Sequence, residues 1–242
     1  MFHSSTQPRP LTIVRPLIFS LMLTAIAVIV LPPLLAHAAV WSSSAQFGSF
    51  TTNGYTFNND VWGSGAGPQT IWVNSSSNWG VWSDQPNTGG VKSYPHDGRT
   101  VGIAINSLHS ATSSFNVSVP GSGAFETAYD IWANNNADEI MLWMNKTGAV
   151  GPLGSLRTTV SVGGYSWALY VGSNGSNQVF SFLDQGSTTS GTVDIRAVLQ
   201  WLVSHGYFGN GPLNEIQFGW EITSTNNTGE NFVGNNFSIS YS

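Results

Sequence analysis

Two stretches of the sequence place carboxylates among aromatic residues, a setting in which a carboxyl group can act as an acid, a base or a nucleophile. The first joins two β-prone runs, 128–133 and 139–144, through Asn134-Asn135-Asn136, which has the composition of a hairpin loop. Asp130 lies on the first run and Glu139 opens the second. The whole chain has only twelve acidic residues, so two of them within these apolar runs indicate a function.

Strand periodicity gives the run 139–144 two different sides, because successive side chains of a strand point to opposite faces. One side carries Glu139, Met141 and Trp143, and the other carries Ile140, Leu142 and Met144. On the partner run, Asp130 and Trp132 share a face. The purely apolar side is a core face. On the other side, burial beside a thioether and an indole should raise the pKa of Glu139.

The second stretch, 216–222, presents Gln217, Gly219 and Glu221 on one face by the same alternation. Gly219 leaves room beside Glu221, as expected where a ligand approaches the backbone. Two carboxylates flanked by indoles fit glycoside hydrolysis, in which one acid protonates the leaving oxygen and the other attacks the anomeric carbon or activates water. Spacing alone does not show that the two strands meet.

Other chemistry finds less support in the residues. A glutamate taken alone is most simply a solvated or ion-paired side chain. The histidines His96, His109 and His205 are too scattered to predict a metal site. No Gly-x-Ser-x-Gly elbow of a serine hydrolase is present.

The composition limits the class of protein and the partners. Charged residues make up 8% of the chain, aromatic residues 12%, and the formal net charge is −5. A neutral-polar, aromatic-rich chain of this kind suits an extracellular β protein. The negative balance argues against nucleic acid as a partner, whereas a neutral polymer is compatible.

The first 38 residues have the features of a signal peptide. Arg9 and Arg15 precede the apolar stretch 17–31, which Pro32-Pro33 interrupts, and Ala36-His37-Ala38 provides a cleavage signal. The apolar stretch 17–31 is shorter than the about 20 residues that a membrane span needs. We therefore predict cleavage after Ala38 and a secreted, extracellular chain with no remaining membrane segment. The alternative is an uncleaved anchor. The chain has no cysteine, so its stability must come from core area.

Residues 39–242 contain no linker or repeat and are predicted to form one all-β domain. Turn signals such as Asn53-Gly54 and Asp97-Gly98 recur about every ten residues between short β-prone runs, a pattern typical of a sandwich or barrel. The segment 193–205 differs, because its apolar residues have helical spacing and Gly206 follows it, so we expect one amphipathic helix there. The run 236–241 alternates Phe237, Ile239 and Tyr241 as a closing strand should.

Taken together, the motifs resemble glycoside hydrolase family 12, the small β-jelly-roll endoglucanases and xyloglucanases. The matching stretches follow the family order over nearly the whole of 39–242, and they include Asn53-Gly54-Tyr55-Thr56, Asn58-Asn59-Asp60-Val61-Trp62-Gly63, Val91-Lys92-Ser93-Tyr94-Pro95, Ala128-Tyr129-Asp130-Ile131-Trp132, Glu139-Ile140-Met141-Leu142-Trp143, Gly151-Pro152-Leu153-Gly154 and Gln217-Phe218-Gly219-Trp220-Glu221. Each stretch is short, but the ordered set is specific.

The resemblance implies a β-jelly-roll sandwich of two antiparallel sheets, with a concave substrate cleft and one packed helix. It implies a retaining double displacement with Glu139 as nucleophile and Glu221 as general acid/base, without a metal or cofactor. Asp130 would hold Glu139 through a shared proton or hydrogen bond. A retaining site further predicts that the carboxyl groups of Glu139 and Glu221 lie about 5–5.5 Å apart.

Substrate-binding residues are implied at seven further positions: Asn59, Trp62, Lys92, Met141, Pro152, Trp143 and Asn174. The chain also departs from the family pattern. Asp60 stands where asparagine is commoner, and Thr70 stands where half of a disulfide is expected. These departures affect the non-reducing side of the cleft and therefore the preferred polymer.

The expected function is secreted endo-β-1,4-glucanase activity on cellulose-type glucan, mixed-linkage glucan or xyloglucan, by a protein acting as a monomer. One alternative is a non-catalytic carbohydrate-binding jelly roll, against which the acid pair argues. The other is a xylanase of the similar family 11, whose thumb hairpin is not found in this sequence.

Overall fold

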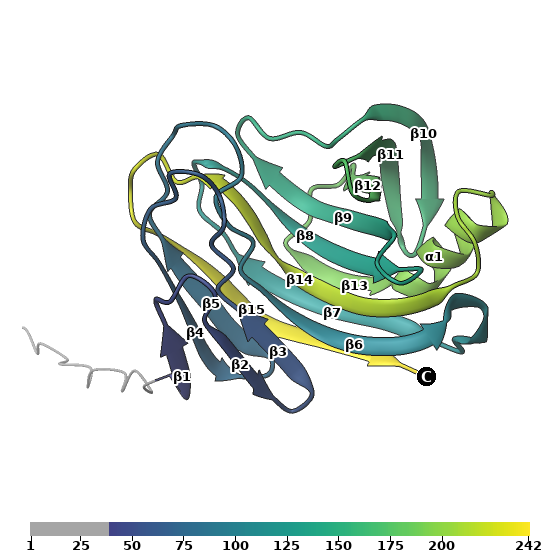
Figure 1. The fold of residues 1–242 in the computed structure, drawn as a ribbon, viewed down its shortest axis with the longest axis horizontal. Coiled ribbons are helices and arrows are strands. Elements are labelled where there is room, and N and C mark those ends of the chain that lie inside the picture. Colours follow the sequence, from purple (N-terminus) through teal and green to yellow (C-terminus); the bar gives the residue numbers. More distant parts are fainter. Residues whose placement is uncertain (1–38) are drawn as a thin grey trace, which may run out of the picture. The chain divides into compact units, whose positions relative to one another are not determined.

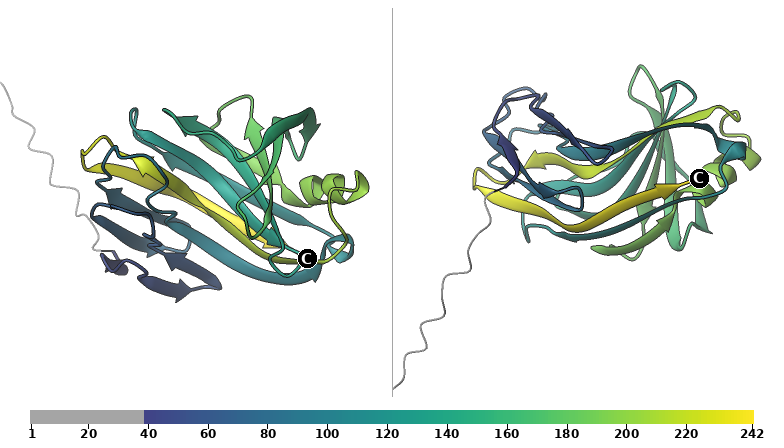
Figure 2. Two further views of the ribbon diagram at one scale, coloured as in Figure 1. Left: turned by 45° about the horizontal axis from the view of Figure 1, so that its top comes forward. Right: turned by 90° about the horizontal axis from the view of Figure 1, so that it is seen from below.

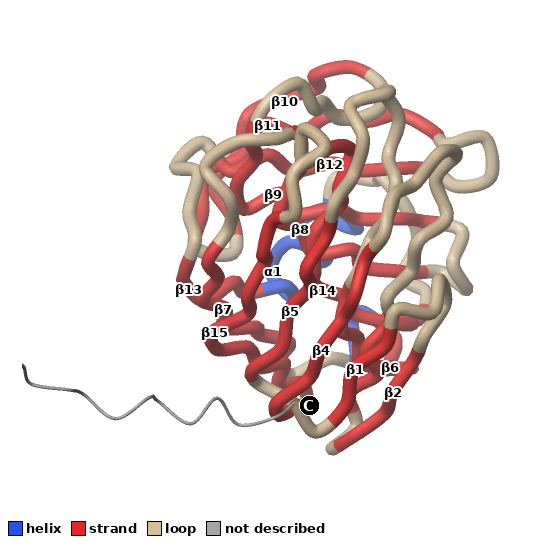
Figure 3. The backbone as a smooth tube through the Cα atoms, turned by 90° about the vertical axis from the view of Figure 1, so that its left-hand side faces the viewer, coloured by secondary structure: helices blue, strands red, loops and turns tan. Residues whose placement is uncertain are grey.

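The computed structural model describes residues 39–242, which fold into two stacked β-sheets and one short α-helix (Figures 1 and 2). The predicted signal segment, 1–38, and its cleavage site lie outside the described residues. Strands make up most of the described chain (Figure 3). Within it, no helix has the length and apolar character needed to span a membrane.

The six-stranded sheet, called the outer sheet below, has the strand order β1-β4-β5-β15-β7-β13. Its strands are β1 (Trp41–Ser43), β4 (Gln69–Ser75), β5 (Asn78–Ser83), β15 (Glu230–Tyr241), β7 (Ala111–Ser118) and β13 (Ser190–Asp194). All of its neighbouring strands pair antiparallel. As predicted, Phe237 and Ile239 of β15 are buried on one face.

The nine-stranded inner sheet carries the candidate site and has the order β10-β11-β12-β9-β8-β14-β6-β3-β2. Its strands are β10 (Ser155–Val162), β11 (Tyr165–Ser173), β12 (Gln178–Asp184), β9 (Asp138–Thr147), β8 (Ala124–Ala133), β14 (Pro212–Ser224), β6 (His96–Ala104), β3 (Tyr55–Asn58) and β2 (Ser49–Thr52). The prediction of two antiparallel sheets needs one correction, because β12 pairs parallel to β9. The long connection from β9 through β10 and β11 makes that parallel pairing possible.

The hairpin of β8 and β9 confirms the prediction for 128–144. Asn134, Asn135 and Asn136 have φ of 54°, 60° and 63°, in the left-handed region that asparagine tolerates better than most residues. The Asn214 side chain accepts hydrogen bonds from the backbone N–H groups of Asn135 (2.9 Å) and Asn136 (3.3 Å). The turn thereby sets Trp132 opposite Glu139 and Asp130 opposite Met141.

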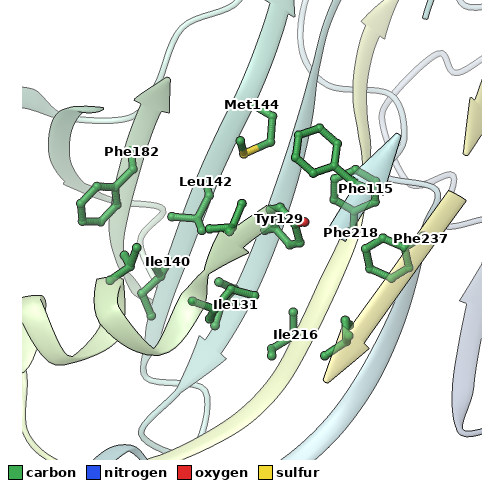
Figure 4. Packing of buried hydrophobic residues seen from close by; sticks show 14 of the residues in the cluster. Phe115, Tyr129, Ile131, Ile140, Leu142, Met144, Phe182, Ile216, Phe218 and Phe237 are labelled. Atoms are coloured by element: carbon green, nitrogen blue, oxygen red, sulfur yellow. The ribbon is translucent and has the colours of Figure 1, made fainter. Parts of the chain in front are cut away.

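The core lies between the sheets, and β9 is buried on both of its faces. Ile140, Leu142 and Met144 belong to the main core, as predicted, beside Tyr129 and Ile131 of β8 (Figure 4). The opposite face of β9 contributes to a smaller cluster made of Ala128, Met141, Trp143 and Val179. Only the first of these two faces belongs to the main core.

The predicted helix is shorter than expected: α1 spans Ile195–Ser204, and Val193 ends up in β13. Asp194 caps its N-terminus by accepting a hydrogen bond from the Ala197 N–H at 3.0 Å. Ile195, Val198, Leu199 and Leu202 form its buried face. A short 3₁₀ turn, η1 (Ile105–Ser107), packs against the helix.

Asp97 of β6 is a fully buried carboxylate in this core, and neither of its oxygens has a hydrogen-bond partner among the described residues. Burial raises the pKa of Asp97 well above its usual range, and the nearby Trp79 indole offsets this only partly. The folded state binds a proton at Asp97 more tightly than the unfolded state does. The stability that this proton contributes is therefore complete below about pH 4 and is lost as pH rises toward the pKa of Asp97 in the folded state.

Asp97→Asn should therefore unfold at a higher temperature than the parent at pH 7, with a smaller gain near pH 4. Protonating the buried carboxyl group costs the folded state about 1.4 kcal/mol for each pH unit between the unfolded and the folded pKa, and each kcal/mol shifts the midpoint by about 2–4 °C in a chain of this size. Thermal unfolding at several pH values measures the difference. Asp84→Asn, which removes the same charge from a less buried position, is the control. A stability gain of the Asp97→Asn variant that does not grow with pH would contradict the prediction.

Candidate active site

A cleft of about 910 Å³ lies on the side of the inner sheet that faces away from the main core. Its floor consists of side chains from β6, β8, β9 and β14, and loops form its walls. The lining residues include Asp60, Trp62, Tyr94, His96, Glu126, Asp130, Trp132, Glu139, Met141, Trp143, Asn174, Glu215, Gln217 and Glu221. No lysine or arginine is among the residues that line it.

The three predicted catalytic carboxylates meet in this cleft. Glu139 lies on β9 and Glu221 on β14, on either side of β8, which carries Asp130 (Figure 1). Asp130 is directly opposite Met141 on one side and Gln217 on the other, so all three strands present their polar faces to the cleft. The sequence alone could not show that the strands of Glu139 and Glu221 come together. In the structure β8 lies between them and pairs with both.

Glu139 combines burial with a single strong hydrogen bond. The Asn174 Nδ2 atom donates to Glu139 Oε2 at 2.9 Å. Burial and the charge of Glu221 raise the pKa of Glu139 to about 7, and the hydrogen bond from Asn174 acts in the opposite direction. Asn174, predicted as a substrate-binding residue, thus also stabilises the ionised form that a nucleophile needs.

Asp130 is coupled to Glu139 by charge and not by the predicted hydrogen bond. Its Oδ1 atom is buried and has no hydrogen-bond partner within residues 39–242. Burial raises the pKa of Asp130 well above its usual range, and the charges of Glu139, Glu221, Glu215 and Asp60 raise it further. Burial and the neighbouring carboxylates therefore both favour the protonated form of Asp130.

The floor of the cleft beside Glu221 includes a neutral histidine. His96 Nδ1 lies 2.7 Å from the Tyr94 carbonyl oxygen, so this nitrogen carries the proton, and Nε2 accepts from the Asn58 amide at 3.2 Å. Burial lowers the pKa of His96 to about 4, so the ring adds no positive charge at neutral pH. The ring of Tyr94 stacks on it, and the Tyr94 hydroxyl donates to the Ala128 carbonyl at 3.2 Å.

Flat apolar surfaces accompany the carboxylates, as sugar binding requires. Trp62 is 51% exposed at the cleft, which is unusual for a side chain of its size. Met141 and Trp143 lie below the surface and still line the cleft. The Trp132 indole donates to Gln217 Oε1 at 3.4 Å and is fixed by it. Indole faces of this kind pack on the C–H faces of sugar rings.

Three predicted substrate-binding positions do not reach the cleft surface. Asn59 is fully buried, and its side chain donates to the Ala45 carbonyl at 2.9 Å. Lys92 is only 2% exposed, because its ammonium group donates to the carbonyl oxygens of Gly89 and Gly90. The Lys92 side chain thereby holds the backbone at Gly90, which lines the cleft. Pro152 does not line the cleft, although Gly151 and Leu153 on either side of it do.

The reason predicted for Gly219 also needs correction. A Cβ at this position would lie 2.1 Å from the Pro95 carbonyl oxygen and 2.8 Å from the Cα of His96. Glycine is required here because the backbone of the neighbouring segment comes close, and not because a ligand does.

Sequence reasoning missed several residues of the cleft, and for some of them a signal existed. Glu126 shares strand parity with Asp130, and Glu215 shares it with Gln217 and Glu221. Both glutamates line the cleft. Tyr94 and His96 gave no such signal, because their stretch contains Pro95 and does not alternate clearly.

The comparisons with known proteins decide the family. Residues 53–242 match the family model described as Glycosyl hydrolase family 12. The chain belongs to this family. It is 31% identical to Endoglucanase S of Pectobacterium parmentieri, over 90% of this chain and 92% of that protein. It is also 31% identical to a probable xyloglucan-specific endo-beta-1,4-glucanase A of Aspergillus flavus, over 85% of this chain and 95% of that protein.

A solved structure supports the same assignment. The xyloglucanase domain of NopAA from Sinorhizobium fredii, determined in complex with cellobiose, has a TM-score of 0.81 and 44% sequence identity. The match covers 84% of this chain and all of that domain. The protein is therefore a glycoside hydrolase with the family 12 jelly roll, and neither the family 11 xylanase nor the non-catalytic binding module describes it.

Proposed function

We propose that the protein is a secreted, monomeric, retaining endo-β-1,4-glucanase that prefers xyloglucan. The observation that carries the proposal is the meeting of Asp130, Glu139 and Glu221 in one indole-lined cleft. Glu139 and Glu221 approach the cleft from strands on either side of β8, as a nucleophile and an acid on opposite sides of one glycosidic bond would.

The proposed reaction has two steps. In the first, Glu139 attacks the anomeric carbon while Glu221 gives its proton to the leaving glycosidic oxygen, so that a glycosyl ester forms and the shortened polymer leaves. In the second, Glu221 takes a proton from water, whose oxygen attacks the same carbon and releases Glu139. Burial and the charge of Glu139 favour the protonated form of Asp130, which places no second negative charge beside the nucleophile.

Two observations support xyloglucan as the preferred polymer. Several relatives, including the one from Aspergillus flavus, are named as xyloglucan-specific. The cleft walls also contain a series of small side chains, which leave space for branches on the glucan backbone: Gly90, Val91, Ala149, Val150 and Gly151. The proposal of secretion is based on the signal-like segment 1–38.

The test is the release of reducing sugar by residues 39–242 from xyloglucan, barley β-glucan and carboxymethyl-cellulose. We expect release from all three, fastest from xyloglucan, with an early fall in viscosity that indicates internal cleavage. NMR of the first products should show the β-anomer, because double displacement retains configuration. Early formation of the α-anomer would contradict the mechanism, and a lower rate on xyloglucan than on the unbranched polymers would contradict the preference.

A further inference from the structure

Glu126 is a buried carboxylate of the cleft to which neither the family resemblance nor the proposed mechanism gives a role. It lies on β8 directly opposite Glu221 of β14. Residues directly opposite in an antiparallel pair point to the same face, with Cβ atoms about 4.5–5.5 Å apart. Both side chains line the cleft, so the Glu126 carboxyl group is the neighbour of the predicted acid/base.

The surroundings of Glu126 disfavour a second negative charge. Its side chain is only 2% exposed, and like charges directly opposite on a sheet repel. Lys146 of β9 is opposite Glu126 on the other side, but it is exposed and its ammonium group donates to the Val150 carbonyl at 3.3 Å. Glu126 therefore has an acid, Glu221, directly opposite on one side and a cation, Lys146, directly opposite on the other. Because Lys146 is exposed to solvent, its charge offsets that of Glu221 only weakly.

The remaining titratable groups around the pair add no positive charge. Asp130 and Glu139 face it from β8 and β9, Glu215 lies on the strand of Glu221, and Asp60, Tyr94 and His96 complete the cleft beside it. His96 is neutral above a pKa of about 4. Burial raises the pKa of Glu126 well above its usual range, a hydrogen bond to Glu221 and the charge of that residue raise it further, and Lys146 opposes the shift.

We propose that Glu126 is a positioning residue that stays protonated through the catalytic cycle and donates its O–H to the Glu221 carboxyl group. The inference rests on the proposed role of Glu221 as acid/base. In the first step Glu221 gives its proton to the leaving oxygen and becomes a carboxylate, which the O–H of Glu126 then stabilises. In the second step Glu221 regains a proton from water. Glu126 keeps its own proton throughout, so it fixes the orientation of Glu221 and stabilises its carboxylate without transferring a proton.

The test compares the pH profiles of kcat/KM for the parent, Glu126→Gln and Glu126→Met. Methionine fills the same space without a donor, so the Glu221 carboxylate should lose a stabilising hydrogen bond and the basic limb should move to higher pH. We expect kcat to fall about ten- to a hundredfold, the loss typical of one hydrogen bond to a charged group. Glutamine supplies a neutral N–H donor and should return the basic limb to the parent position.

Two outcomes would overturn the proposal. A basic limb that stays in place with methionine would leave Glu126 with a packing role only. A basic limb that moves to lower pH with glutamine would show that Glu126 is ionised in the parent, because the neutral amide would then remove a repelling charge. Thermal unfolding of each variant shows whether it is folded, and Glu230→Gln, on β15 of the outer sheet, is the matched control.

A second measurement does not depend on activity. The chain has five glutamates, so carbon-13 labelling of their δ-carboxyl groups gives a spectrum that single Glu→Gln variants can assign. We expect the Glu126 signal to remain at its protonated position from pH 4 to 7. Titration with a midpoint near 4.5, as in a solvated glutamate, would overturn the proposal. If the parent hydrolysed no glucan, the proposed function would fail while this result would still decide the state of Glu126.

Discussion

Glu139→Gln should lower kcat on soluble β-glucans by about 10⁴-fold or more, since removal of a nucleophile that acts in concert with other groups has effects of about 10⁴- to 10⁶-fold. The amide cannot form the glycosyl ester that the double displacement requires. KM should change little, because Met141 and Trp143 still line the cleft. The variant should also fold, since the amide oxygen of the introduced glutamine can accept the hydrogen bond that Asn174 donates to Glu139 Oε2.

The measurement is initial reducing-sugar release from xyloglucan by the variant and by Glu230→Gln as a control for loss of a glutamate elsewhere. A 2-deoxy-2-fluoro cellobioside with a good leaving group should label the parent, and peptide mass spectrometry should locate the sugar on Glu139. The variant should take up no label. Label on another carboxylate, such as Asp130, would contradict the assignment.

Strand alternation explains why the cleft positions of Glu139 and Glu221 could be predicted from the sequence. The apolar face of 139–144 and the aromatic face of 216–222 point to the core, so Glu139 and Glu221 had to lie on the opposite side. Alternation gives the face of a residue but not its partner across the sheet. Glu139 and Glu221 meet because β8 lies between their two strands. Alternation does not predict that strand order, and in this case the family resemblance supplied it.

Three of the predicted substrate-binding residues, Asn59, Lys92 and Pro152, do not line the cleft, and all three lie outside regular strands. Asn59 and Lys92 belong to segments where side chains satisfy backbone carbonyl groups, so a polar residue in a cleft motif can point inward. Alternation also fails at a bulge. The register of β8 and β9 shifts between Thr127 and Ala128, which puts Lys146, and not Asn145, opposite Glu126. No residue type in 139–147 marks that bulge.

The short helix shows the limit of periodicity at element ends. The spacing predicted 193–205, but Val193 pairs with Ser113 of the outer sheet as the end of β13. Asp194 can cap a helix, and the hydrogen bond that it accepts fixes the start at Ile195. An apolar side chain just before the cap is buried equally well in a strand, so hydrophobic spacing alone could not choose between the two.

Glu221→Ala should lower kcat on polysaccharides by about 10²- to 10⁴-fold, the usual contribution of a general acid. The loss should depend on the leaving group. A sugar hydroxyl needs a proton as it departs, whereas dinitrophenolate does not, so glycosyl transfer from dinitrophenyl cellobioside to Glu139 should be nearly unaffected. Azide, which needs no base to attack, should then restore turnover of that substrate and give the β-glycosyl azide, since the anomeric configuration is retained.

The pH profile gives a second and independent signature of the pair. In the parent, burial and the charge of Glu221 raise the pKa of Glu139 to about 7, so the two carboxyl groups share one proton near neutral pH. The productive form has Glu139 ionised and Glu221 protonated, and kcat/KM should therefore fall on both sides of its optimum. Without the charge at position 221 the pKa of Glu139 decreases, so direct titration of its δ-carbon signal in Glu221→Ala should give a midpoint below that of the parent. The basic limb, which reports loss of the acid's proton, should disappear. An unchanged bell-shaped profile would show that another group donates the proton, and Glu126, directly opposite Glu221, would be the first to replace.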